Sequence, residues 1–185
     1  MSLLLYFYLV HFLADYTFQS SCLVKYKSEH FFGIVIHSTV HLLTLLAVLA
    51  PFLSDSKVWT AIAIIYVTHI IIDQSKTVLN KAYPKLILFF YFLDQAVHLL
   101  VVTACGYYVG LLTPKYLTGT ALTLYSDQSV VLYLLILVLV TYFYDVTRYF
   151  VKKEYKKKPF KRDWRTMGMN AGIVTIAFGL YWVLY

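Results

Sequence analysis

Charged residues are scarce in this chain of 185 residues, where they make up 14% of the composition against 61% for hydrophobic residues. Soluble globular domains carry roughly 25% charged residues, so this composition and a mean hydropathy of +0.70 exclude that class. Cysteine is scarce as well, and Cys22 and Cys105 match neither a zinc spacing nor a disulfide framework. The chain is therefore predicted to lie in a lipid bilayer.

A basic soluble surface is also missing, although the net charge is +7. A nucleic-acid-binding protein would carry its basic residues on one soluble face. Here lysine and arginine lie in short segments between apolar runs. We therefore expect membrane lipids, and no nucleic acid, as partners, and the sequence leaves the oligomeric state open.

Long apolar runs dominate the sequence, at about residues 2–20, 31–53, 58–79, 86–112, 129–150 and 167–185. Each approaches the length of about 20 residues with which a helix crosses the hydrocarbon core. The prediction is an all-α polytopic membrane protein, with about six transmembrane helices in one domain that spans the whole chain. Residues 1–113 would form a four-helix core, and residues 114–185 would add two helices joined by a basic loop.

The first run is the least regular, because Asp15, Thr17 and Gln19 make its second half polar. A short or re-entrant segment is the alternative to a full crossing. A polar segment at this depth needs a partner inside the protein.

Lysine and arginine are distributed unevenly between the runs. The segments after the first, third and fifth runs hold 14 of the 16 basic residues, whereas the opposite side has only Lys57 and Lys115. Nine of the 14 lie between Arg148 and Arg165. The positive-inside rule assigns the basic side to the cytoplasm, and six crossings then put both termini outside.

Four of the runs each contain two ionisable residues spaced four apart, which puts both side chains on one face of a helix. The pairs are His11 and Asp15, His37 and His41, His69 and Asp73, and Asp94 and His98. Neighbouring helices run in opposite directions, and yet all four pairs fall in the half of the membrane predicted to be cytoplasmic. Eight ionisable side chains are therefore predicted to converge on one layer.

A metal would explain this convergence. A buried carboxylate is costly unless it is paired, and we expect no lysine or arginine at this depth to pair with it. A divalent cation would supply the positive charge, and mixed histidine and aspartate ligands suit zinc, manganese or iron. All eight residues are predicted metal ligands, with zinc as the leading metal and one or two ions bound. For any single pair, a hydrogen bond between helices is the alternative.

Polar residues around this layer are candidates for orienting ligands or binding substrate, namely Gln19, Lys25, Gln74, Lys76 and Gln95. Lys25 and Lys76 would suit an anionic substrate such as a phosphate, and each is also explained as a lysine that fixes topology. Asp15 is the predicted general base, because it lies on the most polar helix and nearest the cytoplasmic end.

The polar motifs resemble those of a bacterial and phage family of small membrane proteins, family 3307 of the domains of unknown function. The family's pattern reads here as HFLADYTFQ from His11, HSTVH from His37, HIIIDQSK from His69 and DQAVH from Asp94. The resemblance covers about the first 110 residues of the printed sequence. It implies a multi-pass protein of the bacterial cytoplasmic (inner) membrane.

More distantly, the arrangement is similar to the YdjM-like membrane-bound metal-dependent hydrolases, which in turn resemble zinc phospholipase C and the P1 nucleases. That resemblance implies a water molecule activated on zinc for attack on a phosphoester.

Four functions are consistent with these features. The leading hypothesis is a zinc-dependent hydrolase of a lipid or lipid-linked phosphoester at the cytoplasmic leaflet. A metal-ion or proton transporter or channel would use the same residues as a relay, but a cluster confined to one leaflet counts against it. A non-catalytic, metal-stabilised scaffold or partner protein explains the cluster equally well. Bis-histidine haem binding would leave the aspartates unexplained.

Overall fold

Helices account for almost all of the computed structural model, which describes residues 3–152, 154–156 and 160–184. No strand occurs among these described residues, and the all-α prediction is confirmed. Lys153, Lys157 and Lys158 of the predicted basic loop lie outside the described residues. The helices are α1 (Leu4–Phe12), α2 (Ser21–Glu29), α3 (Phe31–Val48), α4 (Ser56–Ala82), α5 (Ile87–Val109), α6 (Gly119–Ser126), α7 (Gln128–Val138), α8 (Tyr144–Val151) and α9 (Trp164–Leu184).

Two π-helical turns and three short 3₁₀ helices complete the helical elements. The π-helical turn η1 (Leu13–Thr17) continues α1, and η4 (Leu139–Phe143) joins α7 to α8. The 3₁₀ helices are η2 (Ala50–Phe52), η3 (Pro84–Leu86) and η5 (Glu154–Lys156). A π-helical turn contains one residue more than a turn of α-helix, and such turns are frequent at functional sites.

Five helical segments are long and apolar enough to cross a membrane: Phe31–Val48, Ser56–Ala82, Pro84–Val109, Gln128–Val151 and Trp164–Leu184. They correspond to the second through sixth predicted runs. The first run is shorter than a full crossing, because α1 has nine residues, η1 has five, and the backbone leaves the helix at Phe18. At 1.5 Å per residue this segment is about 20 Å long, against about 30 Å of hydrocarbon. The short-segment alternative therefore describes it better than a sixth full span.

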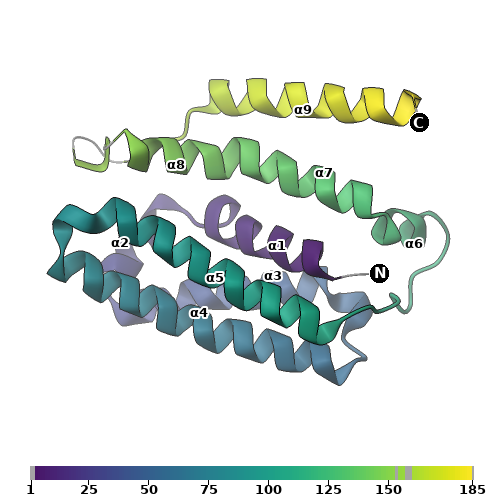
Figure 1. Cartoon of the computed structure of the whole chain (residues 1–185), viewed down its shortest axis with the longest axis horizontal. Coiled ribbons are helices and arrows are strands. Elements are labelled where there is room, and N and C mark those ends of the chain that lie inside the picture. Colours follow the sequence, from purple (N-terminus) through teal and green to yellow (C-terminus); the bar gives the residue numbers. More distant parts are fainter. Residues whose placement is uncertain (1–2, 153, 157–159, 185) are drawn as a thin grey trace.

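The short α1 lies at the centre of the molecule. It contacts α3 and α5 on one side and α7 on the other, while α9 packs outermost against α7 and η4 (Figure 1). A helix that is apolar all round is typically buried. Accordingly Phe7 and Val10 are each 1% exposed, and most of the other side chains of α1 are buried with them.

The helices α1, α3, α4 and α5 form a bundle that is polar in one half and apolar in the other. In the apolar half, Phe7 and Val10 of α1 pack in one cluster with side chains of the other three helices, such as Leu45, Ile62 and Val102. In the other half, the same four helices carry the histidines and aspartates. Each helix is therefore divided between a hydrophobic segment and a ligand-bearing segment.

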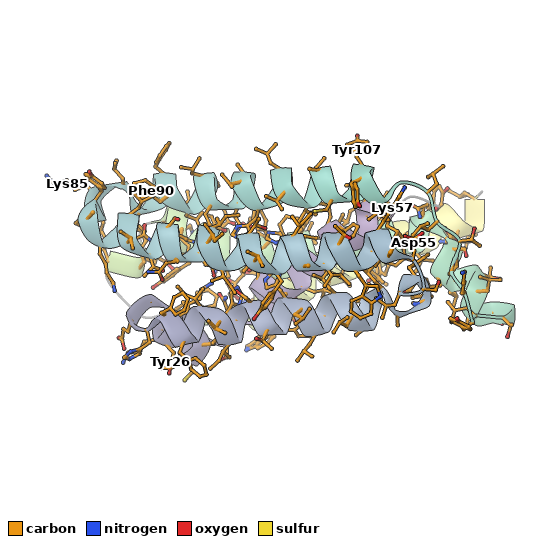
Figure 2. All side chains as sticks on the ribbon, turned by 90° about the horizontal axis from the view of Figure 1, so that it is seen from below. Tyr26, Asp55, Lys57, Lys85, Phe90 and Tyr107 are labelled. Carbon is orange, nitrogen blue, oxygen red and sulfur yellow. The ribbon has the colours of Figure 1, made fainter. Side chains whose placement is uncertain are left out.

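Basic residues gather at the polar end of this bundle. We call it the basic end: α2, the α4–α5 connection and the α8–α9 connection lie there (Figure 1). Lys85 lies at this end, whereas Lys57 and Asp55 lie at the opposite end (Figure 2). Helix α1 begins and α9 ends at that opposite end as well (Figure 1). The structure thus separates the basic segments as expected, and the side of the membrane that each end faces stays a prediction.

Candidate metal centre

The structure brings all eight predicted ligands into one buried cluster between α1–η1, α3, α4 and α5. On α3 and α4, the four-residue spacing turns His37, His41 and His69 inward, and each is at most 1% exposed. On α5, the same spacing turns Asp94 and His98 toward them. The imidazole rings lie close together, with 3.8 Å between the centroids of His41 and His69 and 4.3 Å between those of His69 and His98.

Four of these residues offer ligand atoms around one point: Asp15, His37, His41 and His69. Asp15 Oδ1 lies 3.0 Å from His37 Nε2, 2.9 Å from His41 Nε2 and 3.9 Å from His69 Nε2. Two ligands of a tetrahedral zinc ion, each at about 2.0–2.1 Å, are about 3.3–3.4 Å apart. The observed separations lie on both sides of that value, so small side-chain shifts would suit a metal.

His69 provides the clearest test of whether a metal fits. Its Nδ1 and Nε2 atoms are both buried, and neither has a hydrogen-bond partner in the described structure. Hydrogen bonds from His37 and His41 could satisfy Asp15 without a metal, but they leave His69 unpaired. A buried unpaired polar group costs about 1–3 kcal/mol. A metal at this point would remove that cost, and the four residues therefore fit a metal ion.

A second group of ligand atoms adjoins the first and shares His69 with it: His69, Asp73 and His98. All three residues are buried. Asp73 Oδ2 lies 3.7 Å from Nε2 of both His37 and His69, so the two groups are in direct contact.

Glutamines support the cluster from two sides. The Gln95 amide nitrogen donates hydrogen bonds to Asp15 Oδ2 and Asp94 Oδ2, each at 3.1 Å. The Gln19 amide nitrogen lies 2.8 Å from His37 Nδ1. Gln95 thus contacts Asp15, and Gln19 contacts His37, so both glutamines lie next to predicted ligands, and their orienting role stays a prediction. Gln74 is half-buried on α4 and takes no part in these contacts.

His11 belongs to neither ligand group, although it lies in the cluster. Its Nε2 atom is 3.3 Å from Gln95 Oε1 and 3.6 Å from Asp15 Oδ2. Its ring is 5.3 Å from that of His98. This geometry gives His11 a supporting position beside the carboxylate of Asp15.

The expectation that no lysine pairs with these carboxylates is wrong for two of the three. Lys27 Nζ lies 3.0 Å from Asp73 Oδ2, and Lys76 Nζ lies 2.6 Å from Asp94 Oδ2. Lys76 reaches α5 from α4, and Lys27 reaches α4 from α2, which folds back over the basic end. Asp15 alone has only imidazole partners among the ion pairs of the described residues. Asp15 is therefore the carboxylate of the cluster that lacks a lysine or arginine partner among the described residues.

Lys27 is the site residue that the sequence did not single out. Lys25, which was expected near the substrate, is exposed on α2. Lys27 is held in place by Gly33 of α3, where an added Cβ would lie 2.6 Å from the backbone nitrogen of Lys27. A glycine at this position permits the close approach of α2 to α3. The proximity of Gly33 to the HSTVH motif was the only sequence signal for this contact.

The first two-thirds of the chain match a known family. Residues 3–124 match the family model described as "Protein of unknown function (DUF3307)". The chain belongs to this family. The DUF3307 region contains α1 to α5, most of α6 and all eight clustered residues, whereas α7, α8 and α9 lie outside it. No curated protein and no solved structure matches the chain.

Proposed function

We propose that this DUF3307 protein is an integral-membrane metal-dependent hydrolase that cleaves a lipid or lipid-linked phosphoester at the cytoplasmic leaflet. The observation that carries the proposal is the group of Asp15 and three buried histidines, His37, His41 and His69, around one point. In this proposal these four residues bind a divalent transition metal, with zinc favoured over manganese and iron. Three imidazoles and one carboxylate are typical zinc ligands.

The lysines support a phosphoester as substrate. Lys27 and Lys76 lie directly beside the cluster, with side chains 16% and 22% exposed. Each is paired with a carboxylate in the described structure, and each retains donors for an anionic oxygen because an ammonium group has three. The cluster also lies toward the basic end, where anionic lipid headgroups would gather.

The aspartates divide into two roles in this proposal. Asp15, predicted as the base, lies among three histidines. Its Oδ1 atom is separated from their nitrogens by distances similar to those between two ligands of one ion, which favours a ligand role for it. Asp94 belongs to neither ligand group, and its Oδ1 atom is buried without a hydrogen-bond partner. We therefore assign the general base to Asp94. A bound zinc ion would lower the pKa of its water to near 7, and the base would accept the proton of that water.

A metal-stabilised scaffold is the second candidate, and one observation favours it. The group around Asp15 has four protein ligands, and His37, His41 and His69 are at most 1% exposed. Structural zinc sites are closed in this way, whereas catalytic sites keep an open position. Transport is disfavoured, because a cluster of hydrophobic side chains that includes Leu45, Ile62 and Val102 fills the other half of the same helices.

Metal analysis and a turnover assay on the same detergent-purified protein test the proposal. We expect bound zinc, and release of phosphate or headgroup from mixed bacterial lipids that stops with a chelator and returns with zinc. Metal-loaded protein that turns over no lipid or lipid-linked phosphate would leave the scaffold as the function. Protein that binds no transition metal would contradict both.

A further inference from the structure

The backbone of α5 fixes the imidazole ring of His98 in an orientation that suits a metal ligand. Its Nδ1 atom lies 2.9 Å from the backbone carbonyl oxygen of Asp94, which can only accept, so Nδ1 carries the proton and donates it. The lone pair then resides on Nε2, which is buried and has no hydrogen-bond partner in the described structure. A carbonyl that holds one ring nitrogen while the other faces a metal is a common arrangement at metal-binding histidines.

His69 adjoins both ligand groups, since its Nε2 atom lies 3.9 Å from Asp15 Oδ1 and 3.7 Å from Asp73 Oδ2. Both of its ring nitrogens are buried and unpaired, and it is the one residue common to both groups. A neutral imidazole has one lone pair and one N–H group. Binding through both nitrogens therefore requires the ring to release its remaining proton to solvent, and two flanking cations would favour that loss.

The second group has three protein ligands, one fewer than the group around Asp15. A tetrahedral ion held by three protein ligands keeps a fourth position for water or substrate, which is the pattern of catalytic sites. The second group therefore offers the open position that the first group lacks.

Charge indicates what would fill that position. Two divalent ions together with Lys27 and Lys76 would outweigh Asp15, Asp73, Asp94 and the deprotonated ring of His69 by two positive charges. Such an excess is costly at this burial unless an anion offsets it. A phosphate group would bind the open metal position and both lysines together. Lys27 lies within reach because its ammonium group is already at the site, 3.0 Å from Asp73.

We propose that His69, Asp73 and His98 bind a second divalent metal ion, whose open position takes an oxygen of a phosphate-class anion held by Lys27 and Lys76. This inference rests on the proposed function, since it places the phosphoester at the second ion. It makes the group around Asp15 the fixed ion of a binuclear centre, and the group around His98 the ion that meets substrate. Two ions on one phosphoester would stabilise both the attacking and the leaving oxygen.

Zinc stoichiometry at increasing zinc, with and without inorganic phosphate, tests the proposal on purified full-length protein. We expect one tightly bound ion without phosphate and a second ion whose affinity rises at least tenfold with phosphate. His98→Asn and Asp73→Asn should each keep the first ion and lose the second. His69→Ala should weaken both. His30→Asn, which changes an exposed histidine outside the cluster, should keep both ions.

Two outcomes separate the inference from the proposed function. A single ion at every phosphate concentration, retained in His98→Asn and Asp73→Asn, would overturn the second site and leave the first intact. No bound ion in the parent protein would overturn both. Gel filtration checks that each variant folds. Asp73→Asn preserves the shape of the side chain, whereas His98→Asn removes a ring. If one of the two variants aggregates, the other still tests the second site.

Discussion

Asp15 and Asp145 are the aspartates at the two π-helical turns, and their charges are balanced differently. Asp145, just after η4, lies 3.6 Å from Arg148, which also contacts Asp163 at 2.9 Å. Asp15, within η1, is surrounded by imidazoles, and its ion-pair partners among the described residues are all histidines. The charge of Asp145 is therefore balanced by an arginine of its own region, whereas Asp15 lies in a group of residues that could hold a metal ion from solution.

The largest expected effect comes from removing each aspartate in turn. Asp15→Ala should lower metal affinity more than about 100-fold, since loss of a supporting residue alone costs 10–100-fold. Asp145→Ala should leave metal content unchanged and cost about 1 kcal/mol of unfolding free energy or less, because Arg148 retains Asp163. Metal analysis and thermal unfolding in detergent would measure both. Equal metal loss in the two variants would remove the distinction between the regions.

Catalysis gives the next largest effect. Asp94→Asn should keep the metal and lower turnover about 100-fold or more, because general-base assistance is worth 10²–10⁴. Asp55→Asn is the matched control, since this partly exposed aspartate caps α4 at the opposite end of the bundle. Initial rates on metal-loaded protein decide it. Unchanged turnover in Asp94→Asn would show that Asp94 is not the base.

Cysteine labelling tests whether the basic end, to which Asp15 and Asp145 both lie closer, faces the cytoplasm. Cys22 is exposed on α2 at the basic end, whereas Cys105 is buried. A thiol reagent that cannot cross membranes should therefore leave the protein unmodified in intact cells and label Cys22 after permeabilisation. Lys57→Cys, at the opposite end, should react in intact cells in a Cys22→Ser background. The reverse pattern would invert the predicted topology.

The smallest expected effect is on the thermal stability that Asp163 provides. This aspartate is the partner of Arg148 and lies outside the membrane-spanning segments. Hydrogen bonds from the backbone and side chain of Thr166, and then from Arg148, hold the pKa of Asp163 below its usual value of 3.8. A lowered folded-state pKa adds stability above the unfolded value, and this is lost as pH falls toward the folded value. Asp163→Asn should thus melt lower than the parent protein at pH 6, with the difference shrinking below pH 4. A difference that stays constant across pH would exclude the carboxylate charge as its cause.

Spacing explains how much of this structure was predictable. A four-residue step fixes a helix face, so the convergence of His37, His41, His69 and His98 could be predicted, as could the five long spans. Contacts between separate helices follow no such rule. Lys27 meets Asp73 only because α2 folds onto α3 at Gly33, and apolar periodicity does not predict that fold. The shortness of the first helix was visible in its polarity, but the π-helical geometry of η1 was not.

The extra residue in η1 also restricts the length of this segment in related proteins. Removing one residue from this turn would restore an ordinary helix and rotate everything before it by about 100° relative to everything after it. Phe7 and Val10 would then leave the core, or Asp15 would leave its three histidines. The residues between the polar positions from His11 to Gln19 should therefore tolerate substitution better than a change in length. We expect related proteins with the same function to have the same number of residues in this segment, even where the residues between the polar positions differ.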